Sequence, residues 1–307
     1  MPPTRVKADV ADALHTGSPV VALESTIISH GLPHPDNFEA AKRFEALVRE
    51  YGANPATIAV IDGVARIGLE DSELELIASA DDVEKLSVRD LPIVMARGGH
   101  GATTVAATAF LAVKAGISVF ATGGLGGVHQ GANTSFDESA DLGTLAHTPV
   151  AVVSAGVKSV LDIQATLERL ETLSVPVLGY ATDVFPRFWL PRSDFPVDHR
   201  VDSPEEVAAV LASLRQLGLD SGVLVANPIP EDKAWSVDEH DRLVDQAFAA
   251  ANQEGIRGKE VTPFLLDYIQ RESGGDSLRV NLDVVAHNIE VAAGIARAVS
   301  ERASSSD

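Results

Sequence analysis

The segment Val150-Ala151-Val152-Val153-Ser154-Ala155-Gly156-Val157-Lys158 joins a short apolar run to a turn of small residues that ends in a lysine. The pattern that follows, with Val160, Leu161, Ile163 and Leu167, is typical of an amphipathic helix. An apolar run without alternation indicates a strand buried on both faces, as in parallel sheets. The order of strand, turn and helix therefore predicts an α/β protein.

The same unit recurs along the chain. Further apolar runs occupy Pro19–Leu23, Thr57–Ile61, Pro92–Met95, Ile117–Ala121, Val175–Leu178 and Gly222–Ala226, with helical patterns between them, the last from about Leu282 to Ser300. The sequence has no linker, repeat or low-complexity tract. We expect one catalytic domain over residues 1–307, a three-layer α/β/α sandwich around a mostly parallel or mixed sheet, with a disordered tail over about 301–307.

The composition excludes several classes of protein. A net charge of −20 disfavours nucleic acid as a partner, because a negative surface repels phosphate backbones. The absence of cysteine excludes disulfides, thiol nucleophiles and Cys-ligated zinc. The N-terminus lacks an apolar signal segment, and no apolar run approaches the ~18 residues that cross a bilayer. We expect a soluble, cytoplasmic protein with a small-molecule substrate and no membrane partner.

Two candidate catalytic residues follow predicted strands. Ligands of open α/β sheets bind outside the carboxyl ends of the strands. Glu24 lies there, where partial enclosure raises the pKa of a carboxyl group and suits it to act as a general acid; the alternative is a capping or salt-bridged glutamate. Lys158 lies before a predicted helix, whose positive N-terminus disfavours an ammonium and favours a nucleophilic amine. Its alternative is a solvated surface lysine.

Asp137 and Asp141 are four residues apart, and on one helical turn they would face the same way. Carboxylates with water suit hard cations such as Mg²⁺ or Mn²⁺. The alternative is that Asp137 caps a helix and Asp141 is exposed. Two glycine-rich loops, 98–104 and 122–129, offer N–H groups that could hold a phosphate, or glycines that serve tight turns and close packing.

Taken together, ordered segments resemble the pseudouridine-5'-phosphate glycosidase family. The resemblance rests on Val21–Gly31, Pro55–Ala59, Gly101–Val105, Phe120–His129, Phe136–Asp141, Val225–Pro230, Gly258–Leu266 and Gly274–Leu278. It spans residues 6 to 300, nearly the whole chain. The loop from Arg97 to His100 departs from members that carry Lys or Asn there, which leaves its substrate contacts open.

The resemblance implies a role for individual residues. It implies that Lys158 forms a Schiff base, that Glu24 donates a proton and that Asp137 binds Mn²⁺. Lys85, Val105, Ser139, Ala140 and Asp141 match substrate-contacting positions, and Asn281 matches a further active-site asparagine. It also implies an α/β/α fold and a homotrimer.

The implied activity is the reversible, lyase-type cleavage of the C–C glycosidic bond of pseudouridine 5'-phosphate. The products are uracil and ribose 5-phosphate, reached through an imine between a lysine and the ring-opened ribose. The family also includes proteins named for indigoidine pathways, so the physiological substrate stays open. The alternatives are a metal-assisted N-glycosidase of a nucleoside phosphate, a class I aldolase-like enzyme and a non-catalytic sugar-phosphate-binding protein.

Overall fold

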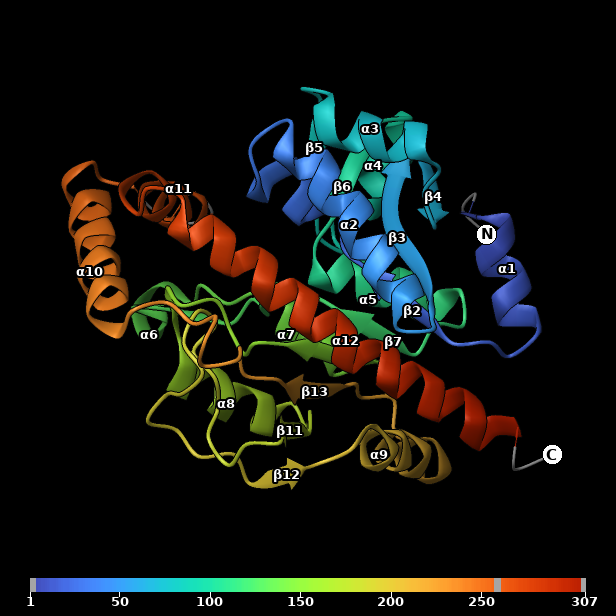
Figure 1. The fold of residues 1–307 in the computed structure, drawn as a ribbon. Helices are drawn as coiled ribbons and strands as arrows, with labels where there is room; N and C mark the ends of the chain where they lie inside the picture. Colours follow the sequence, from blue (N-terminus) through green and yellow to red (C-terminus); the bar gives the residue numbers. More distant parts are fainter. Residues whose placement is uncertain (1–3, 257–260, 305–307) are drawn as a thin grey trace.

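A computed structural model describes residues 4–256 and 261–304. Its centre is a sheet with the strand order β1-β4-β3-β2-β7-β9-β13-β11-β12, to which β6 adds beside β3 and β5 beside β6 (Figure 1). The strands are β1 (Thr4–Val6), β2 (Val20–Leu23), β3 (Asn54–Ile61), β4 (Val64–Ile67), β5 (Val83–Leu86), β6 (His100–Thr103), β7 (Val119–Ala121), β9 (Ala151–Ser154), β11 (Val177–Tyr180), β12 (His199–Val201) and β13 (Val223–Ala226). Two short strands, β8 (Val128–His129) and β10 (Leu161–Asp162), form a separate antiparallel pair.

Helices lie on both faces of the sheet. They are α1 (Ala8–His15), α2 (Asp36–Glu50), α3 (Asp71–Ser79), α4 (Leu91–Arg97), α5 (Val105–Lys114), α6 (Ala132–Ser135), α7 (Ala140–Leu145), α8 (Ile163–Thr172), α9 (Pro204–Leu217), α10 (Val237–Gln253), α11 (Val261–Glu272) and α12 (Asp276–Ser304), with a π-helical turn, η1 (Ile27–Gly31). Val21 and Leu23 of β2 pack on the layer that contains α2, α9 and α12, whereas Val20 and Ala22 pack on the layer that contains α5 and α7. Successive strand residues point to opposite faces, so a continuous apolar run serves both layers.

The predicted three-layer fold with a mixed sheet is confirmed. β2 pairs in parallel with β3 and β7, and β9 pairs in parallel with β7 and β13. β3 pairs antiparallel with β4 and β6, which makes the sheet mixed. No helix of the described residues is long and apolar enough to span a membrane.

The prediction of a strand at Pro92–Met95 is wrong, because this run lies in α4. Pro92 lies in the first turn, where its missing N–H costs no helical hydrogen bond. Leu91 and Val94 are buried while Ile93 is 46% exposed, the spacing of a helix face rather than a strand. Gly98 ends α4 with φ 69°, a left-handed conformation that glycine adopts without strain.

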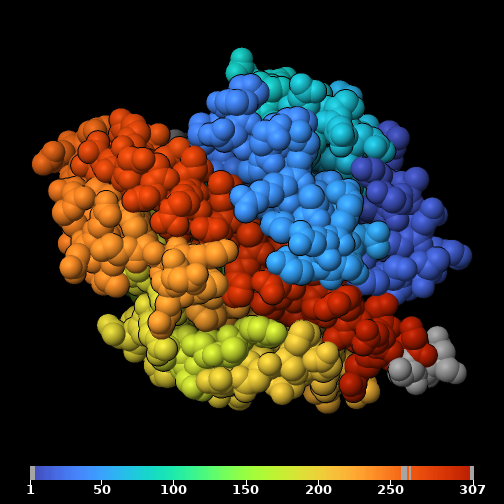
Figure 2. All heavy atoms as spheres, in the orientation of Figure 1, coloured from blue at the N-terminus to red at the C-terminus, as the bar shows by residue number. Residues whose placement is uncertain are grey.

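The last helix is longer than predicted. It begins at Asp276, directly after Gly274 and Gly275, whose φ angles of 61° and 98° separate it from α11. It continues to Ser304, so the expected disordered tail is helical over 301–304, and 305–307 lie outside the described residues. Residues 258–260 of the segment Gly258–Leu266 also lie outside them. In Figure 2, α12 (red) runs between the N-terminal part of the chain (blue) and the segment near α9 (yellow).

Candidate active site

A cavity of about 520 Å³ opens where β2, β7 and β9 end, as the strand-end rule predicts. Glu24 follows β2, Gly123 and Gly124 follow β7, and Lys158 follows β9. The cavity is lined by Glu24, Thr26, Ile27, His30, Gly31, Leu32, Pro33, Lys85, Gly123, Gly124, Lys158, Phe188, Trp189, Thr262, Leu266, Asp267, Gln270, Ser277, Leu278, Asn281 and Val285. The sheet and α12 therefore bring the predicted acid, the predicted nucleophile, Lys85 and Asn281 to one pocket.

Glu24 is half-buried and lies close to three charged groups. Burial is the largest influence and raises the pKa of its carboxyl group above the usual 4.5, whereas the charge on Lys158 and a hydrogen bond from Thr122 Oγ1 lower it. The next residues are anchored, because Ser25 Oγ donates to Ile58 O (2.7 Å) and Thr26 Oγ1 donates to Thr103 O (2.8 Å). The prediction of a raised pKa is confirmed. A carboxyl group that retains its proton to higher pH is suited to general-acid catalysis.

Lys158 lies in the turn between β9 and β10. Its N–H donates to Leu125 O (3.1 Å) and its carbonyl accepts from Leu161 N (2.9 Å). The following helix, α8, begins only at Ile163 with Asp162 as its N-cap. The expectation that a helix N-terminus acts on Lys158 is therefore wrong, because dipole effects are confined to the first turn.

Gly124 provides the space beside Lys158. A Cβ at this position would lie 2.7 Å from the Phe188 ring and 3.5 Å from Lys158 Cγ. Contacts under 3.0 Å force neighbouring atoms to move, so any larger residue would displace the Phe188 ring from the pocket wall.

Two buried asparagines that the sequence analysis did not single out as site residues support the loop beside Glu24. Asn288, in α12, is 1% exposed, and its Nδ2 donates to Thr122 O (2.7 Å). Its Oδ1 accepts from Nδ2 of Asn227 (3.0 Å), which follows β13. The signal in the sequence is an amide on the apolar face of α12, between Val285 and Ala292. A buried amide at such a position needs specific partners.

Asp137 and Asp141 do not share a helical turn. Asp137 precedes α7, whose N-cap is Ser139, and Asp141 is buried in its first turn. Asp141 accepts from Ala106 N (2.8 Å) through Oδ1 and from Gly126 N (2.9 Å) through Oδ2. The prediction that the two carboxylates face the same way is wrong, as is the alternative that Asp141 is exposed. A buried carboxylate with two backbone donors is a structural anchor for α5 and the glycine loop.

The remaining predicted contacts lie outside the cavity lining. The described residues that line the cavity do not include Val105, Asp137, Ser139, Ala140 or Asp141. Val105 begins α5 next to Ala106, whose N–H Asp141 binds, so these residues form one unit behind the glycine loop. The structure thus places them together behind the glycine loop, where the charge on Asp141 still raises the pKa of Glu24.

Asp137 has one neighbour that could share a metal ion. Its Oδ2 lies 3.9 Å from His129 Nδ1, and burial lowers the pKa of His129, which favours the neutral imidazole that binds metals. Within residues 4–256 and 261–304, no three His, Asp or Glu side chains converge on one point. One carboxylate and one imidazole fit a hydrated divalent cation whose other ligands are water or substrate.

The glycine-rich loops direct most of their N–H groups at protein acceptors. In the loop 122–129, Leu125 N donates to Gly156 O, Val128 N to Thr166 Oγ1 and His129 N to Asp137 O. In the loop 98–104, Gly98 N donates to Met95 O and Gly99 N to Val94 O. These contacts favour the interpretation in which the glycines serve tight turns and close packing, over the interpretation in which the loops bind a phosphate. Positive side chains at the cavity are Lys85 and Lys158, with His30 beside them.

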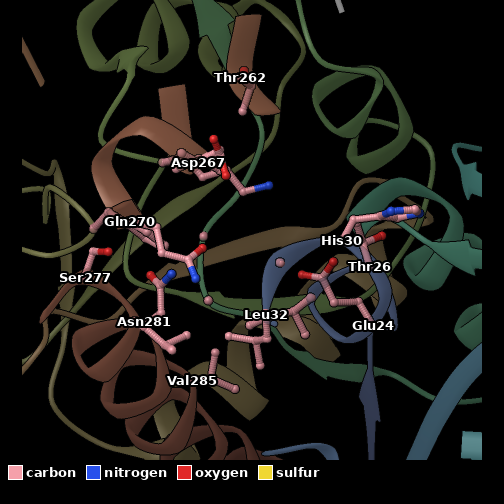
Figure 3. Close-up of a pocket in the computed structure, with 18 of the residues that line it drawn as sticks. Glu24, Thr26, His30, Leu32, Thr262, Asp267, Gln270, Ser277, Asn281 and Val285 are labelled. Atoms are coloured by element: carbon pink, nitrogen blue, oxygen red, sulfur yellow. The ribbon is translucent and has the colours of Figure 1, made fainter. Parts of the chain in front are cut away.

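Asn281 lies at the far side of the cavity from Glu24 and His30 (Figure 3). Trp189 Nε1 donates a short hydrogen bond of 2.5 Å to Asn281 Oδ1. Trp189 is 1% exposed, and its ring lies 5.1 Å from Phe188 and 5.3 Å from Trp235 between centroids. Phe188 and Trp189 thus form one wall of the cavity, with Trp235 packed behind Trp189.

The fold and the pocket together define an α/β enzyme in which a lysine and a carboxyl group with a raised pKa line one cavity. The chain belongs to the family described as indigoidine synthase A like protein, whose model matches residues 9–298. It is 58% identical over 293 residues to a pseudouridine-5'-phosphate glycosidase of Frankia alni, covering 95% of this chain and 81% of the relative.

Two solved structures share the fold. The prealnumycin C-glycosynthase AlnA, in complex with ribulose 5-phosphate, superposes with a TM-score of 0.92 at 38% identity and covers 99% of each chain. The indigoidine synthase A-like protein of Thermotoga maritima has a TM-score of 0.86 at 36% identity, over 97% of this chain and 96% of that one. The resemblance inferred from the sequence segments is confirmed.

Proposed function

We propose that this protein is a pseudouridine-5'-phosphate glycosidase, which releases uracil and ribose 5-phosphate by cleaving a C–C glycosidic bond. The observation that carries the proposal is that Glu24 and Lys158 line one cavity and act on each other electrostatically, while burial raises the pKa of Glu24. The names of the relatives support the substrate, and the ribulose 5-phosphate bound to AlnA supports a sugar phosphate in this fold.

A carbon-linked base cannot leave by protonation of a nitrogen, so its C5 must receive a proton while C1' receives electrons from a donor. Glu24 donates a proton to the ribose ring oxygen as the ring opens, and the amine of Lys158 bonds to C1'. In the cleavage direction the lone pair of the lysine nitrogen forms the C1'=N imine, and uracil leaves with the electron pair of the C1'–C5 bond and takes up a proton at C5. In the reverse direction the protonated imine accepts the electron pair of uracil C5. Water then hydrolyses the imine, so that the overall reaction adds one water across the C1'–C5 bond and frees Lys158.

Asp137, with His129, is the proposed manganese site. The ion would supply positive charge that orders water and polar substrate groups. Chelation followed by removal of the chelator should abolish uracil release, and Mn²⁺ should restore it. Asp137→Asn should raise the Mn²⁺ concentration needed for half-maximal activity. Full turnover after exhaustive chelation, with no metal found by elemental analysis, would exclude the site.

The 5'-phosphate is proposed to bind near Lys85, on β5 at the rim of the cavity. In a chain with a net charge of −20, a local positive group is the feature that attracts an anionic substrate. Lys85→Ala should mainly raise KM, since it removes binding to a non-reacting group. Equal activity on unphosphorylated pseudouridine would contradict this assignment.

The decisive experiment compares pseudouridine 5'-phosphate with uridine 5'-phosphate and follows uracil release. The C-linked substrate should be cleaved and the N-linked one should not. Borohydride added with ribose 5-phosphate should attach the reduced sugar phosphate to Lys158, and Lys158→Ala should lose both the adduct and turnover. Cleavage of only the N-linked nucleotide would favour an N-glycosidase, and an adduct that persists in Lys158→Ala would exclude the imine at this residue.

A further inference from the structure

Polar side chains of α11 and the first turns of α12 form one end of the cavity (Figure 3). Three groups there have no hydrogen-bond partner within the described parts of the chain: Asn281 Nδ2, the side-chain amide of Gln270 and Thr262 Oγ1. Thr262 Oγ1 is also buried. A buried hydroxyl without a partner is costly unless a ligand supplies one, and the amides of Asn281 and Gln270 are open to the same part of the cavity, so this end is suited to a ligand with its own donors and acceptors.

The contact with Trp189 determines which way the Asn281 amide points. An indole N–H can only donate, so the atom 2.5 Å from Trp189 Nε1 is the amide oxygen, Oδ1. The NH₂ group of the Asn281 amide is therefore the group that can donate to a ligand in the cavity. Rotation of the amide by half a turn would set an NH₂ against the indole N–H and leave both groups without an acceptor.

Trp189 has little freedom to release this amide. Its side chain is almost fully buried between Phe188 and Trp235, and its carbonyl accepts from Trp235 N (3.1 Å). A side chain held on several sides preorganises the group to which it is bonded. The Asn281 amide is therefore a fixed donor before any ligand arrives.

We propose that Trp189 is a specificity-positioning residue: through Asn281 Oδ1, it sets this end of the cavity to accept a ring carbonyl and to reject a ring amino group. The inference rests on the proposed function, because it assigns this end of the cavity to uracil. A carbonyl oxygen of uracil accepts from Asn281 Nδ2. An amino group at the same ring position would place two donors together, and the unpaired groups would cost a factor of roughly ten to a hundred in binding.

The test uses pseudouridine 5'-phosphate and its two analogues with an amino group in place of the C2 or the C4 carbonyl. The wild-type kcat/KM should favour the carbonyl at one of these positions by about ten to a hundredfold. Trp189→Phe frees the amide to present its oxygen and should reduce this ratio by about tenfold. The intrinsic reactivities of the substrates cancel when the ratios of two proteins are compared. Calorimetry with free uracil, cytosine and isocytosine measures the same preference without turnover.

Trp235→Phe is the matched control, because it keeps an aromatic ring and the backbone N–H against Trp189 and loses only an indole N–H that bonds Glu239 (3.3 Å), which is not a cavity residue. It should leave the ratio unchanged. Asn281→Asp replaces the donor by an acceptor and should reverse the preference, which tests the idea even if Trp189→Phe does not fold. An unchanged ratio in Trp189→Phe, or no reversal in Asn281→Asp, overturns the proposal. Selective binding of uracil without its release from pseudouridine 5'-phosphate would refute the proposed function and support this inference.

Discussion

Thr122 connects the buried asparagine amides to Glu24, the proposed catalytic acid. Its hydroxyl donates to Glu24 Oε1 and its carbonyl accepts from Asn288 Nδ2. A hydrogen bond to a carboxylate favours the charged form, so the hydroxyl lowers the pKa of Glu24 against the effect of burial. One side chain thus adjusts the pH at which Glu24 gives up its proton.

Thr122→Val removes this hydroxyl and keeps the shape of the side chain. The pKa of Glu24 should rise, and the alkaline limb of kcat/KM against pH should move to higher pH, because a general acid works in its protonated form. Thr122→Ser retains the hydroxyl and should keep the wild-type profile. Identical profiles for the Val and Ser variants would show that the Thr122 hydroxyl does not set the pKa of the catalytic acid.

Glu24→Gln should make the protein more stable at high pH while it abolishes turnover. The folded pKa of Glu24 is raised, so folded wild type binds more protons than the unfolded chain above about pH 4.5, and its stability falls as pH rises through the folded pKa. Glutamine resembles the protonated acid and avoids this loss, by about 1.4 kcal/mol for each unit by which the pKa is raised. Urea unfolding at pH 4 and pH 8 measures the difference, which should appear only at the higher pH.

At the scale of elements, Asp141 ties α7 to the N-terminus of α5 and to the glycine loop. Asp141→Asn leaves only one acceptor for two buried N–H groups and should cost about 2 kcal/mol of unfolding free energy. Asp162→Asn is the control, because Asp162 Oδ1 caps α8 by accepting from Ala165 N (2.9 Å), and asparagine caps equally well. Equal urea midpoints for the two variants would contradict the anchoring of α5 by Asp141.

The elements show how far the sequence could be interpreted alone. Apolar runs such as Val150–Val153 predict strands correctly, because burial on both faces leaves a strong signal. The strand predicted at Pro92–Met95 is a helix, because a four-residue apolar run fits a short helix equally well. The strand-end rule placed Glu24 and Lys158 at one cavity. The roles of Asn288 and Trp189 depend on contacts with residues 166 and 92 positions away, which no local pattern records.

At the scale of the whole molecule, the apolar helix faces have partners within the chain. Faces such as Val207–Leu211 and Val291–Val299 would mark an interface if some of them were left uncovered. They are covered, because α9 packs against α12 and Val207, Leu211 and Val291 share one core. The proposed homotrimer now rests on the family resemblance.

Phe136 is the side chain that we expect at the subunit contact. It is 84% exposed, has φ 56° and directly precedes Asp137. A subunit contact over this ring would remove its apolar surface from water and would lie next to Asp137. Native mass spectrometry should show three times the 32.2 kDa chain mass, and Phe136→Asp should shift it toward the monomer and lower activity.

Leu217→Asp is the control for this change, because Leu217 is also exposed (73%) but lies at the end of α9, away from α6 in Figure 1. It should leave the assembly intact. A fully active wild-type monomer at low micromolar concentration would refute the trimer. Dissociation by Leu217→Asp alone would place the contact at the other end of the molecule.

The place of α12 in the sequence affects the order in which the cavity is assembled during protein synthesis. Glu24 is synthesised early, whereas Asn281, Val285 and Asn288 follow in α12, more than 250 residues later. Until α12 has been synthesised, the cavity lacks the wall that this helix supplies, and Thr122 O lacks the hydrogen bond from Asn288. A chain interrupted before α12 would therefore carry Glu24 and Lys158 in an incomplete cavity.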